Sequence, residues 1–461
     1  MQLQRKILGL LFTIALILPV ISFSQEEMVL TLDKSVTIAL EQNPEIKIAE
    51  KELAKAKTGV WEAYSTILPQ LNGSVNFQHA WEIQKNVIPN FLKIMMGSMA
   101  PPDAPDYVEI AFGLKNTFSY GVTLTQPLYL GGAGLAGIQI GHAAKRAAVQ
   151  SLEAKRQNLI FHTVNAFYTC LLVKEIVTVQ KEALAQSEAN LDIVVKKYNV
   201  GAASGFDKMR AEVEVANLKP EIISTQNNYQ SALTGLRTVL GLDKDVTIKL
   251  KGQFEYSEDI FGEKTLQEIQ NMALLKRPEI LAFSEQKYMA RKGISIARSN
   301  FLPKLFFQTD YSYLAMEDSI KKFSRDDFNK GFTSAISLQI PLFTGFKSVK
   351  QYQKAKLDYR MTLDTEKQVN DGILAEAEVA YNKFHEAKEK YLSANQSVGL
   401  AEEALRLANM MYEEGANTQL DVLNSQVALI RARLNRITSL YEYQMACYQL
   451  RKVTGTLKQI L

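Results

Sequence analysis

The stretch Tyr198-Asn199-Val200-Gly201-Ala202-Ala203-Ser204-Gly205-Phe206-Asp207 recurs in outline 214 residues later as Tyr412-Glu413-Glu414-Gly415-Ala416-Asn417-Thr418-Gln419-Leu420-Asp421. Nearer the N-terminus the matches have an offset of 234 residues, as when Pro44-Glu45-Ile46 recurs as Pro278-Glu279-Ile280. The offset changes because the first half carries 20 extra residues between Leu71 and Pro127. A repeat of this length is a whole structural half used twice, not a short solenoid unit.

Long helices surround both copies of this stretch. From Ile373 to Tyr412 apolar residues recur at alternating steps of four and three, which is the spacing of a coiled-coil seam. In the first half, an unbroken helix from about Ala133 to Asn199 would be ~100 Å long. After the glycine turn the same spacing resumes, at Leu420, Leu423, Val427, Ile430, Leu434, Ile437 and Tyr441 in the second copy. The pattern predicts two long helical hairpins.

Four segments have a period of two instead. The alternating apolar residues are Leu71, Val75, Phe77, Trp81 and Ile83, then Phe118, Tyr120, Val122 and Leu124, and in the second half Leu305, Phe307, Tyr311 and Tyr313, then Phe332, Ile336, Leu338 and Ile340. Each segment has about the 9 to 11 residues of a membrane-spanning strand, with one apolar and one polar face. A soluble sheet with one covered face is the alternative. We favour membrane strands because their apolar faces are aromatic. The apolar stripes of the helices already pack in the coiled-coil seams, so no other layer is left to cover the sheet.

Four strands are too few to close a barrel, since the smallest barrels have about eight. In hydrocarbon, each unpaired backbone group at an open sheet edge costs several kcal/mol. We therefore expect the chain to oligomerise and so complete the sheet.

The N-terminus predicts export. Arg5 and Lys6 precede an apolar run over residues 7–20, and Ser22-Phe23-Ser24 offers small residues for cleavage, so we expect a signal peptide over residues 1–24. We expect no membrane-spanning helix, because no later stretch reaches about 18 uncharged apolar residues. Cleavage of the signal peptide removes Arg5 and Lys6 and lowers the formal charge from +4 to +2. The mature chain is then nearly neutral and has no basic tract suited to nucleic acid, so we expect no nucleic-acid partner.

The two cysteines and four histidines do not form a pattern typical of a redox or metal site. Cys170 takes the column position that Phe384 takes in the second half, so we expect it and Cys447 to pack as buried thiols. The histidines lack metal-ligand spacing. We expect no catalytic residues, no metal and no cofactor.

These features resemble the TolC-type outer membrane efflux proteins over residues 29 to 457. The resemblance implies a mixed α and β membrane protein: a homotrimer whose twelve pooled strands form one barrel in outer membrane lipid, continued by a coiled-coil tunnel across the periplasm. It also implies docking of a periplasmic membrane fusion (adaptor) protein and an inner-membrane pump of the RND or ABC type. The function that follows is a passive exit duct for efflux or type I secretion, opened at its tip by partners. The sequence does not indicate which substrate is transported.

In this family a ring at the helical tips closes the tube with a tyrosine, an arginine and aspartates. Tyr412, Asp421 and Asp207 match the pattern, whereas Asn417 stands at the arginine position and Asn424 at the second aspartate of the later turn. An arginine–aspartate pair therefore cannot hold this mouth shut. We expect closure by neutral hydrogen bonds of ~0.5–1.5 kcal/mol each and an aperture that prefers cations.

Two further sets of residues are expected to matter. The residues expected to contact the adaptor at the tips are Tyr198, Gly201, Ser204, Gly415 and Thr418. The residues expected to end the strands at the junctions with the helices are Pro69, Pro127, Pro303 and Pro341. The insertion lies within the first strand pair, so its Pro/Met-rich loop, Met95 to Pro105, should be the longer surface loop.

We accordingly divide the chain into a signal peptide (1–24), an equatorial and helical segment (25–68), outer-membrane β-hairpin 1 (69–130), helical hairpin 1 (131–241), an equatorial connector (242–277), a helix of the second repeat (278–302), outer-membrane β-hairpin 2 (303–343) and helical hairpin 2 (344–461).

Two other classes of protein are kept open. Gly132-Ala133-Gly134-Leu135-Ala136-Gly137 fits the dinucleotide-binding pattern after a predicted strand. The second copy lacks these glycines, so we favour a tight strand-to-helix bend, and nucleotide binding tests the enzyme alternative. An exported structural coiled coil with a small soluble sheet would remain in the aqueous phase and conduct no ions.

Overall fold

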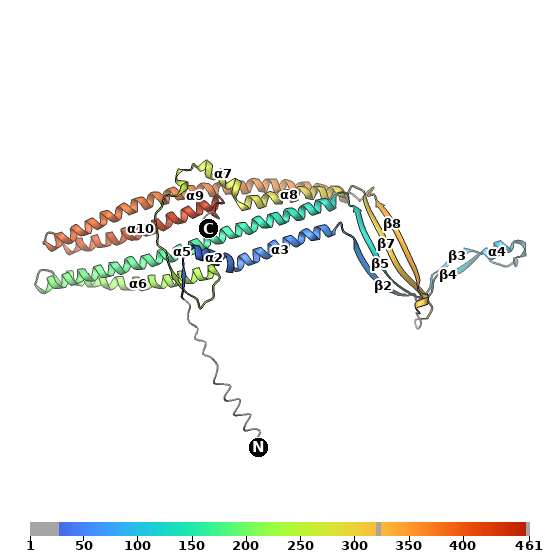
Figure 1. Ribbon diagram of the computed structural model, residues 1–461, viewed down its shortest axis with the longest axis horizontal. Helices are drawn as coiled ribbons and strands as arrows, with labels where there is room; N and C mark the ends of the chain where they lie inside the picture. Colours follow the sequence, from blue (N-terminus) through green and yellow to red (C-terminus); the bar gives the residue numbers. More distant parts are fainter. Residues whose placement is uncertain (1–26, 320–323, 458–461) are drawn as a thin grey trace, which may run out of the picture. The chain divides into compact units, whose positions relative to one another are not determined.

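The computed structural model describes residues 27–319 and 324–457 (Figure 1). The expected signal peptide, residues 1–24, lies outside the described residues. By its internal contacts the chain divides into two compact units. Of the described residues, 27–51, 151–280 and 369–457 belong to the first unit, and 52–150, 281–319 and 324–368 belong to the second.

The two halves of the sequence form equivalent elements in the same order (Figure 1). The first half forms β1 (Glu27–Leu30), α2 (Leu32–Gln42), α3 (Pro44–Ser65), β2 (Gln70–His79), β5 (Asn116–Tyr129), α5 (Ala133–Asn199) and α6 (Gly205–Leu240). The second forms β6 (Thr247–Leu250), α7 (Leu266–Lys276), α8 (Pro278–Ser299), β7 (Lys304–Glu317), β8 (Asn329–Gln339), α9 (Lys347–Glu413) and α10 (Gln419–Val453). Helices α5 and α9 each have 67 residues, which confirms the long helices and the duplication.

Residues repeated in the sequence begin the shorter helices. Thr31 and Thr265 are the N-caps of α2 and α7, where each hydroxyl accepts a backbone N–H from the first turn. Pro44 and Pro278 are the first residues of α3 and α8, a position at which the missing N–H of proline costs nothing.

The second unit holds an antiparallel sheet of four strands in the order β2-β5-β7-β8. The hairpin register is the same in both halves, because Gln70 lies opposite Thr125 as Lys304 lies opposite Gln339. The apolar side chains of the edge strands are exposed, at 71% for Val75 and 69% for Ile336. An apolar sheet face left open to this extent is typical of a face that contacts lipid.

The expected proline boundary is wrong at Pro127. Pro69 and Pro303 directly precede β2 and β7, and Pro341 lies just beyond β8. Pro127, however, lies inside β5 opposite Phe306. The register shifts between Pro127 and Tyr129, two residues later, which lies opposite Leu305. A bulge accommodates the missing N–H, so the strand continues past the proline.

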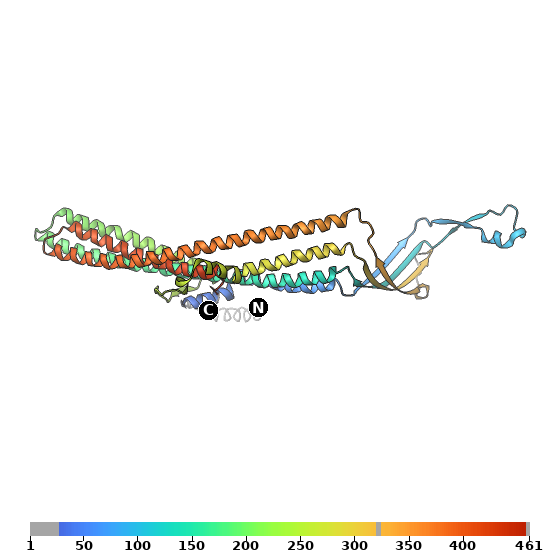
Figure 2. The same ribbon diagram turned by 90° about the horizontal axis from the view of Figure 1, so that it is seen from above.

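The loop of the first strand pair is more structured than the sequence predicted. β2 ends at His79, and beyond it β3 (Lys85–Pro89) and β4 (Tyr107–Ala111) form a second, antiparallel ribbon. Between them lie α4 (Phe91–Met96) and the 3-10 turn η1 (Gly97–Met99). Two further 3-10 turns, η2 (Ile260–Glu263) and η3 (Arg325–Asp327), lie in the second half. We call residues 80–115 the arm; Figures 1 and 2 show it as a ribbon with a helical tip.

The first unit contains α6, α10, α5 from residue 151 onward and α9 from residue 369 onward, with β1 and β6 paired in parallel. Its core contains Phe384, which is fully buried, and Cys447, exposed by 4%. Cys170, the equivalent of Phe384, is also fully buried, and both cysteines are free. Burial raises the pKa of each thiol to about 12, so both are structural, as expected.

One described helix, α5, contains an 18-residue window apolar enough to cross a membrane by length and composition alone. We expected no membrane-spanning helix beyond the N-terminus from the sequence. The buried residues Phe167, Cys170 and Leu171 of α5 give its apolar composition a packing role, since core helices pass the same test.

Candidate functional site

Both hairpins turn through the same backbone motif. Gly201 and Gly415 have φ values of 78° and 76°, a left-handed conformation that favours glycine. The N–H after each glycine donates back to a carbonyl five residues earlier, from Ala202 to Lys197 at 2.8 Å in the first tip. This is the C-terminal cap of α5, and Ala416 repeats it at the end of α9.

The next residues of the motif start the returning helix. In the first tip the Asp207 carboxylate accepts hydrogen bonds from the Ser204 hydroxyl at 2.6 Å and from the Ser204 N–H at 3.2 Å. The Ser204 hydroxyl in turn accepts from the Asp207 N–H at 3.1 Å. Thr418 and Asp421 form the same capping box at α10. The repeated Tyr-x-x-Gly-Ala-x-Ser/Thr-x-x-Asp sequence is therefore a helix stop followed by a helix start.

The two aspartates expected in the aperture ring, Asp207 and Asp421, have a local role within one chain. Their carboxylates accept the hydrogen bonds of the capping boxes described above. Asn417 likewise accepts from the neighbouring Thr418 N–H at 3.0 Å, and Asn424 is exposed on α10. The pKa of Tyr412 is raised above its ordinary value. Burial is the larger cause, and the negative charge of Asp207 is the second.

Sequence reasoning missed the side chain that joins the two tips. The Lys197 ammonium, from the end of α5, donates to the Tyr412 carbonyl at 2.6 Å. It also lies 3.9 Å from the centroid of the Tyr412 ring, within cation–π range. The repeat equivalent of Lys197 is Met411, so this contact between a lysine and a tyrosine is not repeated at the equivalent position. A charged contact therefore joins the two hairpins within one chain, while closure of the aperture by neutral hydrogen bonds and packing stays a prediction.

The two tips also carry opposite charge. Residues 196–210 contain four basic residues and one acidic residue, a net charge of +3. The equivalent residues 410–424 contain three acidic residues and no basic residue, a net charge of −3. The positive tip offsets the acidic character expected of the aperture, whose cation preference stays a prediction. Tyr198, 43% exposed, lies at the positive tip with the Lys208 ammonium 5.4 Å from its ring.

The cap of the second tip should depend on pH. Hydrogen bonds from the Thr418 hydroxyl and N–H lower the pKa of Asp421 from the ordinary 3.8. A carboxyl with a lowered folded pKa stabilises above its ordinary pKa and loses that effect as pH falls through the lowered value. We expect hydrogen-exchange protection of the Thr418 and Asp421 amides to fall below about pH 4, and Asp421→Ala to lack this dependence. Wild-type protection that stays constant to about pH 2 would contradict the assignment.

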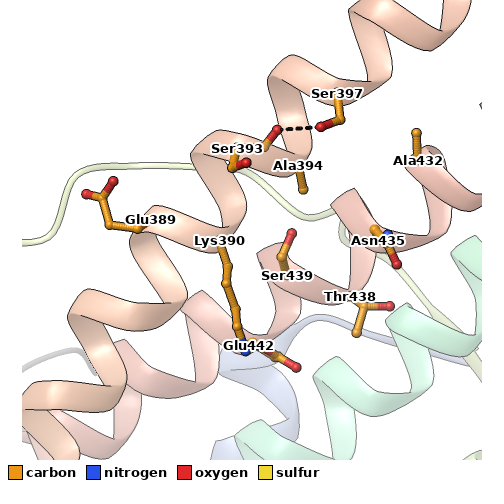
Figure 3. A pocket seen from close by; sticks show the side chains of 10 residues that line it. All are labelled: Glu389, Lys390, Ser393, Ala394, Ser397, Ala432, Asn435, Thr438, Ser439 and Glu442. Carbon is orange, nitrogen blue, oxygen red and sulfur yellow. Dashed lines mark hydrogen bonds and ion pairs between the residues drawn. The ribbon is translucent and has the colours of Figure 1, made fainter.

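A groove of about 560 Å³ lies between α9 and α10. Figure 3 shows the ten side chains that line it. Its walls are mostly small side chains such as Ser393, Ala394 and Ala432, and Lys390 bridges Glu386 at 2.6 Å and Glu442 at 3.7 Å. The groove holds no nucleophile–base pair. Larger residues such as Leu218 stand at equivalent positions in the first half.

The glycine-rich segment has a packing role. Gly132 has a φ of 86°, which fits the bend expected there. Gly134 leaves room for the turn that follows α3, because a Cβ at that position would collide with Ile67. Among residues 27–319 and 324–457 no cluster of His, Cys, Asp and Glu could hold a metal. The start of α5 therefore packs closely against the turn after α3 at Gly134.

A duplicated chain with an open amphipathic sheet and paired helical hairpins defines a conduit-forming membrane protein. The model of the family "Outer membrane efflux protein" matches residues 36–242 and 269–456. The chain therefore belongs to the outer membrane efflux protein family. It is an outer membrane channel protein of efflux and secretion systems; members of the family are channels, not enzymes.

Relatives and solved structures agree with this assignment. The outer membrane protein TolC of Vibrio cholerae is 21% identical over 91% of this chain and 90% of its own. The alkaline protease secretion protein AprF of Pseudomonas aeruginosa is 19% identical over 92% and 84%. The crystal structure of the Campylobacter jejuni CmeC outer membrane channel has a TM-score of 0.75 at 19% identity and covers 92% of this chain and 86% of its own. The last comparison shows the fold.

Proposed function

We propose that three copies of this chain form a homotrimeric exit duct. Twelve strands, four from each copy, would close one barrel in outer membrane lipid, and six helical hairpins would line a periplasmic tunnel. The open sheet is the observation that carries the proposal, since β2 and β8 each have one unpaired edge. Unpaired edges in hydrocarbon are costly, and a closed barrel removes them.

The repeat supplies a register for the missing contact. β5 pairs with β7 inside the chain, and the repeat equivalents of these strands are β8 and β2. Thr123 lies opposite Asp310 in the internal pair. Applying the offsets of 214 and 234 places Ser337 of one copy opposite Asn76 of the next. The same rule that joins the two halves thus joins neighbouring copies.

The helices support the same arrangement. Arg433 of α10 pairs with Glu182 of α5 at 3.2 Å, and Tyr441 of α10 donates to Asn165 of α5 at 2.8 Å. α10 therefore packs against the other hairpin of its own chain. On that helix the apolar stripe predicted from the sequence is partly buried: Leu423 and Ile437 are each 7% exposed.

The equivalent stripe of α6 has no cover within the chain. Its members are Phe206, Met209, Val213, Ala216, Pro220 and Ile223, and all are exposed. On α9, two equivalents of α5 residues near α10 are also apolar and exposed: Val379 at 68% stands for Asn165, and Leu392 at 42% stands for Thr178. The exposed apolar surfaces of α6 and α9 are thus the repeat equivalents of the surfaces by which α10 and α5 pack together within the chain. We infer that α6 of one copy packs against α9 of the next.

A cysteine pair tests the trimer and its register. Directly opposite residues in an antiparallel pair lie about 4.5–5.5 Å apart at Cα, within disulfide range. We expect Asn76→Cys with Ser337→Cys to give a disulfide-linked ladder up to trimers on oxidation in membranes. The buried native thiols, with pKa values raised to about 12, should not interfere.

Asn76→Cys with Thr333→Cys is the matched control. Thr333 lies on the same strand face as Ser337 but four residues away, or ~13 Å along β8. We expect little cross-linking from this pair or from either single variant. Absence of a ladder from the first pair in a correctly inserted protein would refute the interface, and a ladder from the control pair would refute the register.

Partners at the tips complete the proposal. A passive duct needs energy from elsewhere, so an adaptor protein and an inner-membrane pump would engage the tips, and Tyr198, Gly201, Ser204, Gly415 and Thr418 are the proposed contacts. The aperture would form at Tyr412 and the two capped aspartates. The relatives' names include alkaline protease secretion and cobalt-zinc-cadmium resistance. We therefore propose a general export duct in which the pump selects the cargo.

A further inference from the structure

The arm ends in a tip whose apolar side chains point outward. The large exposed residues there are Phe91 (65%), Leu92 (69%), Ile94 (66%), Met95 (83%) and Met99 (85%). Soluble surfaces rarely leave a contiguous apolar patch of this kind uncovered. The patch belongs to the 20-residue insertion of the first half, so it occurs once per chain.

The tip is folded by its own polar groups. Asn90 caps α4 by accepting from the Lys93 N–H at 3.3 Å and donates from its amide to the Pro105 carbonyl at 3.0 Å. The Lys93 ammonium donates to the Ala104 carbonyl at 2.6 Å and to the Asp106 carboxylate at 2.7 Å. The polar atoms are thus used inside the tip, and the apolar side chains are held on its surface.

The charge of the tip argues against a lipid surface as the cover. Residues 86–108 contain one basic and two acidic residues, a net charge of −1. The one cation, Lys93, already pairs with Asp106. Anionic headgroups recruit free lysines and arginines, and none is present in this stretch.

Continuity with the open sheet edge points to other copies of this chain. The arm begins directly after β2, whose free edge is the edge that a neighbouring copy would complete. We propose that the α4 tips of the three copies pack against one another and form an apolar cap at the end of the barrel remote from the helices. The proposal rests on the trimer proposed above.

The dimensions allow this contact. A barrel of twelve strands has a radius of about 12 Å. The five residues of β3 alone extend ~16 Å, so each arm can reach the axis. Tethering to one barrel also gives the three tips a millimolar effective concentration of one another. Self-association is therefore favoured over capture of a dilute partner.

One cysteine per chain tests the cap. Near a threefold axis the same residue of each copy meets its equivalents, so Met95→Cys should link two of the three subunits on mild oxidation and leave one thiol free. Glu109→Cys, exposed on β4 away from α4, is the control and should cross-link at least tenfold more slowly. We expect Phe91→Ser with Met95→Ser to raise single-channel conductance at least twofold.

The outcomes separate the cap from the trimer. If Asn76→Cys with Ser337→Cys gives the trimer ladder while Met95→Cys links no faster than Glu109→Cys, the cap is overturned and the trimer stands. If the edge cysteines give no ladder, both proposals fall. Unchanged conductance of the double serine variant would overturn the cap as a barrier.

Discussion

Replacing Lys197 by methionine should raise the conductance of the resting channel. Lys197 is the side chain that joins the tips, through the Tyr412 carbonyl at 2.6 Å and the Tyr412 ring. Hydrogen bonds to charged groups contribute ~1.5–3 kcal/mol and partial exposure reduces this, so we expect a loss of about 1–2 kcal/mol per copy. That corresponds to a roughly 5- to 30-fold shift toward the open tip per copy. Methionine is also the residue at the equivalent position of the second half, Met411.

Lys196→Met is the matched control for this prediction. Lys196 is the adjacent residue, and its ammonium pairs with Asp192 on the same helix at 2.6 Å, with both side chains exposed. Such surface pairs contribute little, about 0.3–0.5 kcal/mol. Conductance in planar bilayers should therefore rise for Lys197→Met and stay near wild type for Lys196→Met. Equal conductance of the two variants would show that the Lys197 contact does not hold the tips together.

The sequence predicted the parts of the fold that have a period. The duplication, the ends of α5 near Ala133 and Asn199, and the four strands of the sheet all follow from repeated spacing along the chain. It also held the signal for the capping boxes, because a serine or threonine three residues before an acid is typical of a helix start. The assignment of Asp207 and Asp421 to the aperture came from the family resemblance alone and stays a prediction, whereas their capping role is visible within one chain.

Contacts between distant residues could not be predicted in this way. Lys197 meets Tyr412 only because two hairpins lie side by side, and no spacing encodes that meeting. The path of β5 past Pro127 depends on a bulge against β7, which is a tertiary adjustment. The arm was expected to be a loop because its strands of five residues are short and its proline content suggested irregular structure.

The stripe of α6 gives the second large prediction. Val213→Glu with Ile223→Glu should abolish the trimer while leaving the chain folded, because these residues are 52% and 60% exposed within one copy. In the proposed trimer each loses about 1.5–3 kcal/mol of apolar burial and adds the cost of a buried, unpaired carboxylate. With three interfaces, association should weaken by more than about a thousandfold. Unheated gel electrophoresis and native mass spectrometry in detergent would measure the loss.

A control with the same added charge decides whether the stripe itself is responsible. Asn217→Glu with Asn228→Glu places two carboxylates on exposed positions of α6 beside the stripe. This variant should remain trimeric, since those side chains stay in water. The equivalent stripe on α10 is partly buried within the chain, so Leu423→Glu should instead lower the stability of the monomer. The same six positions would then stabilise the fold in one half and the assembly in the other, and a trimer that survives the α6 substitutions would contradict that division.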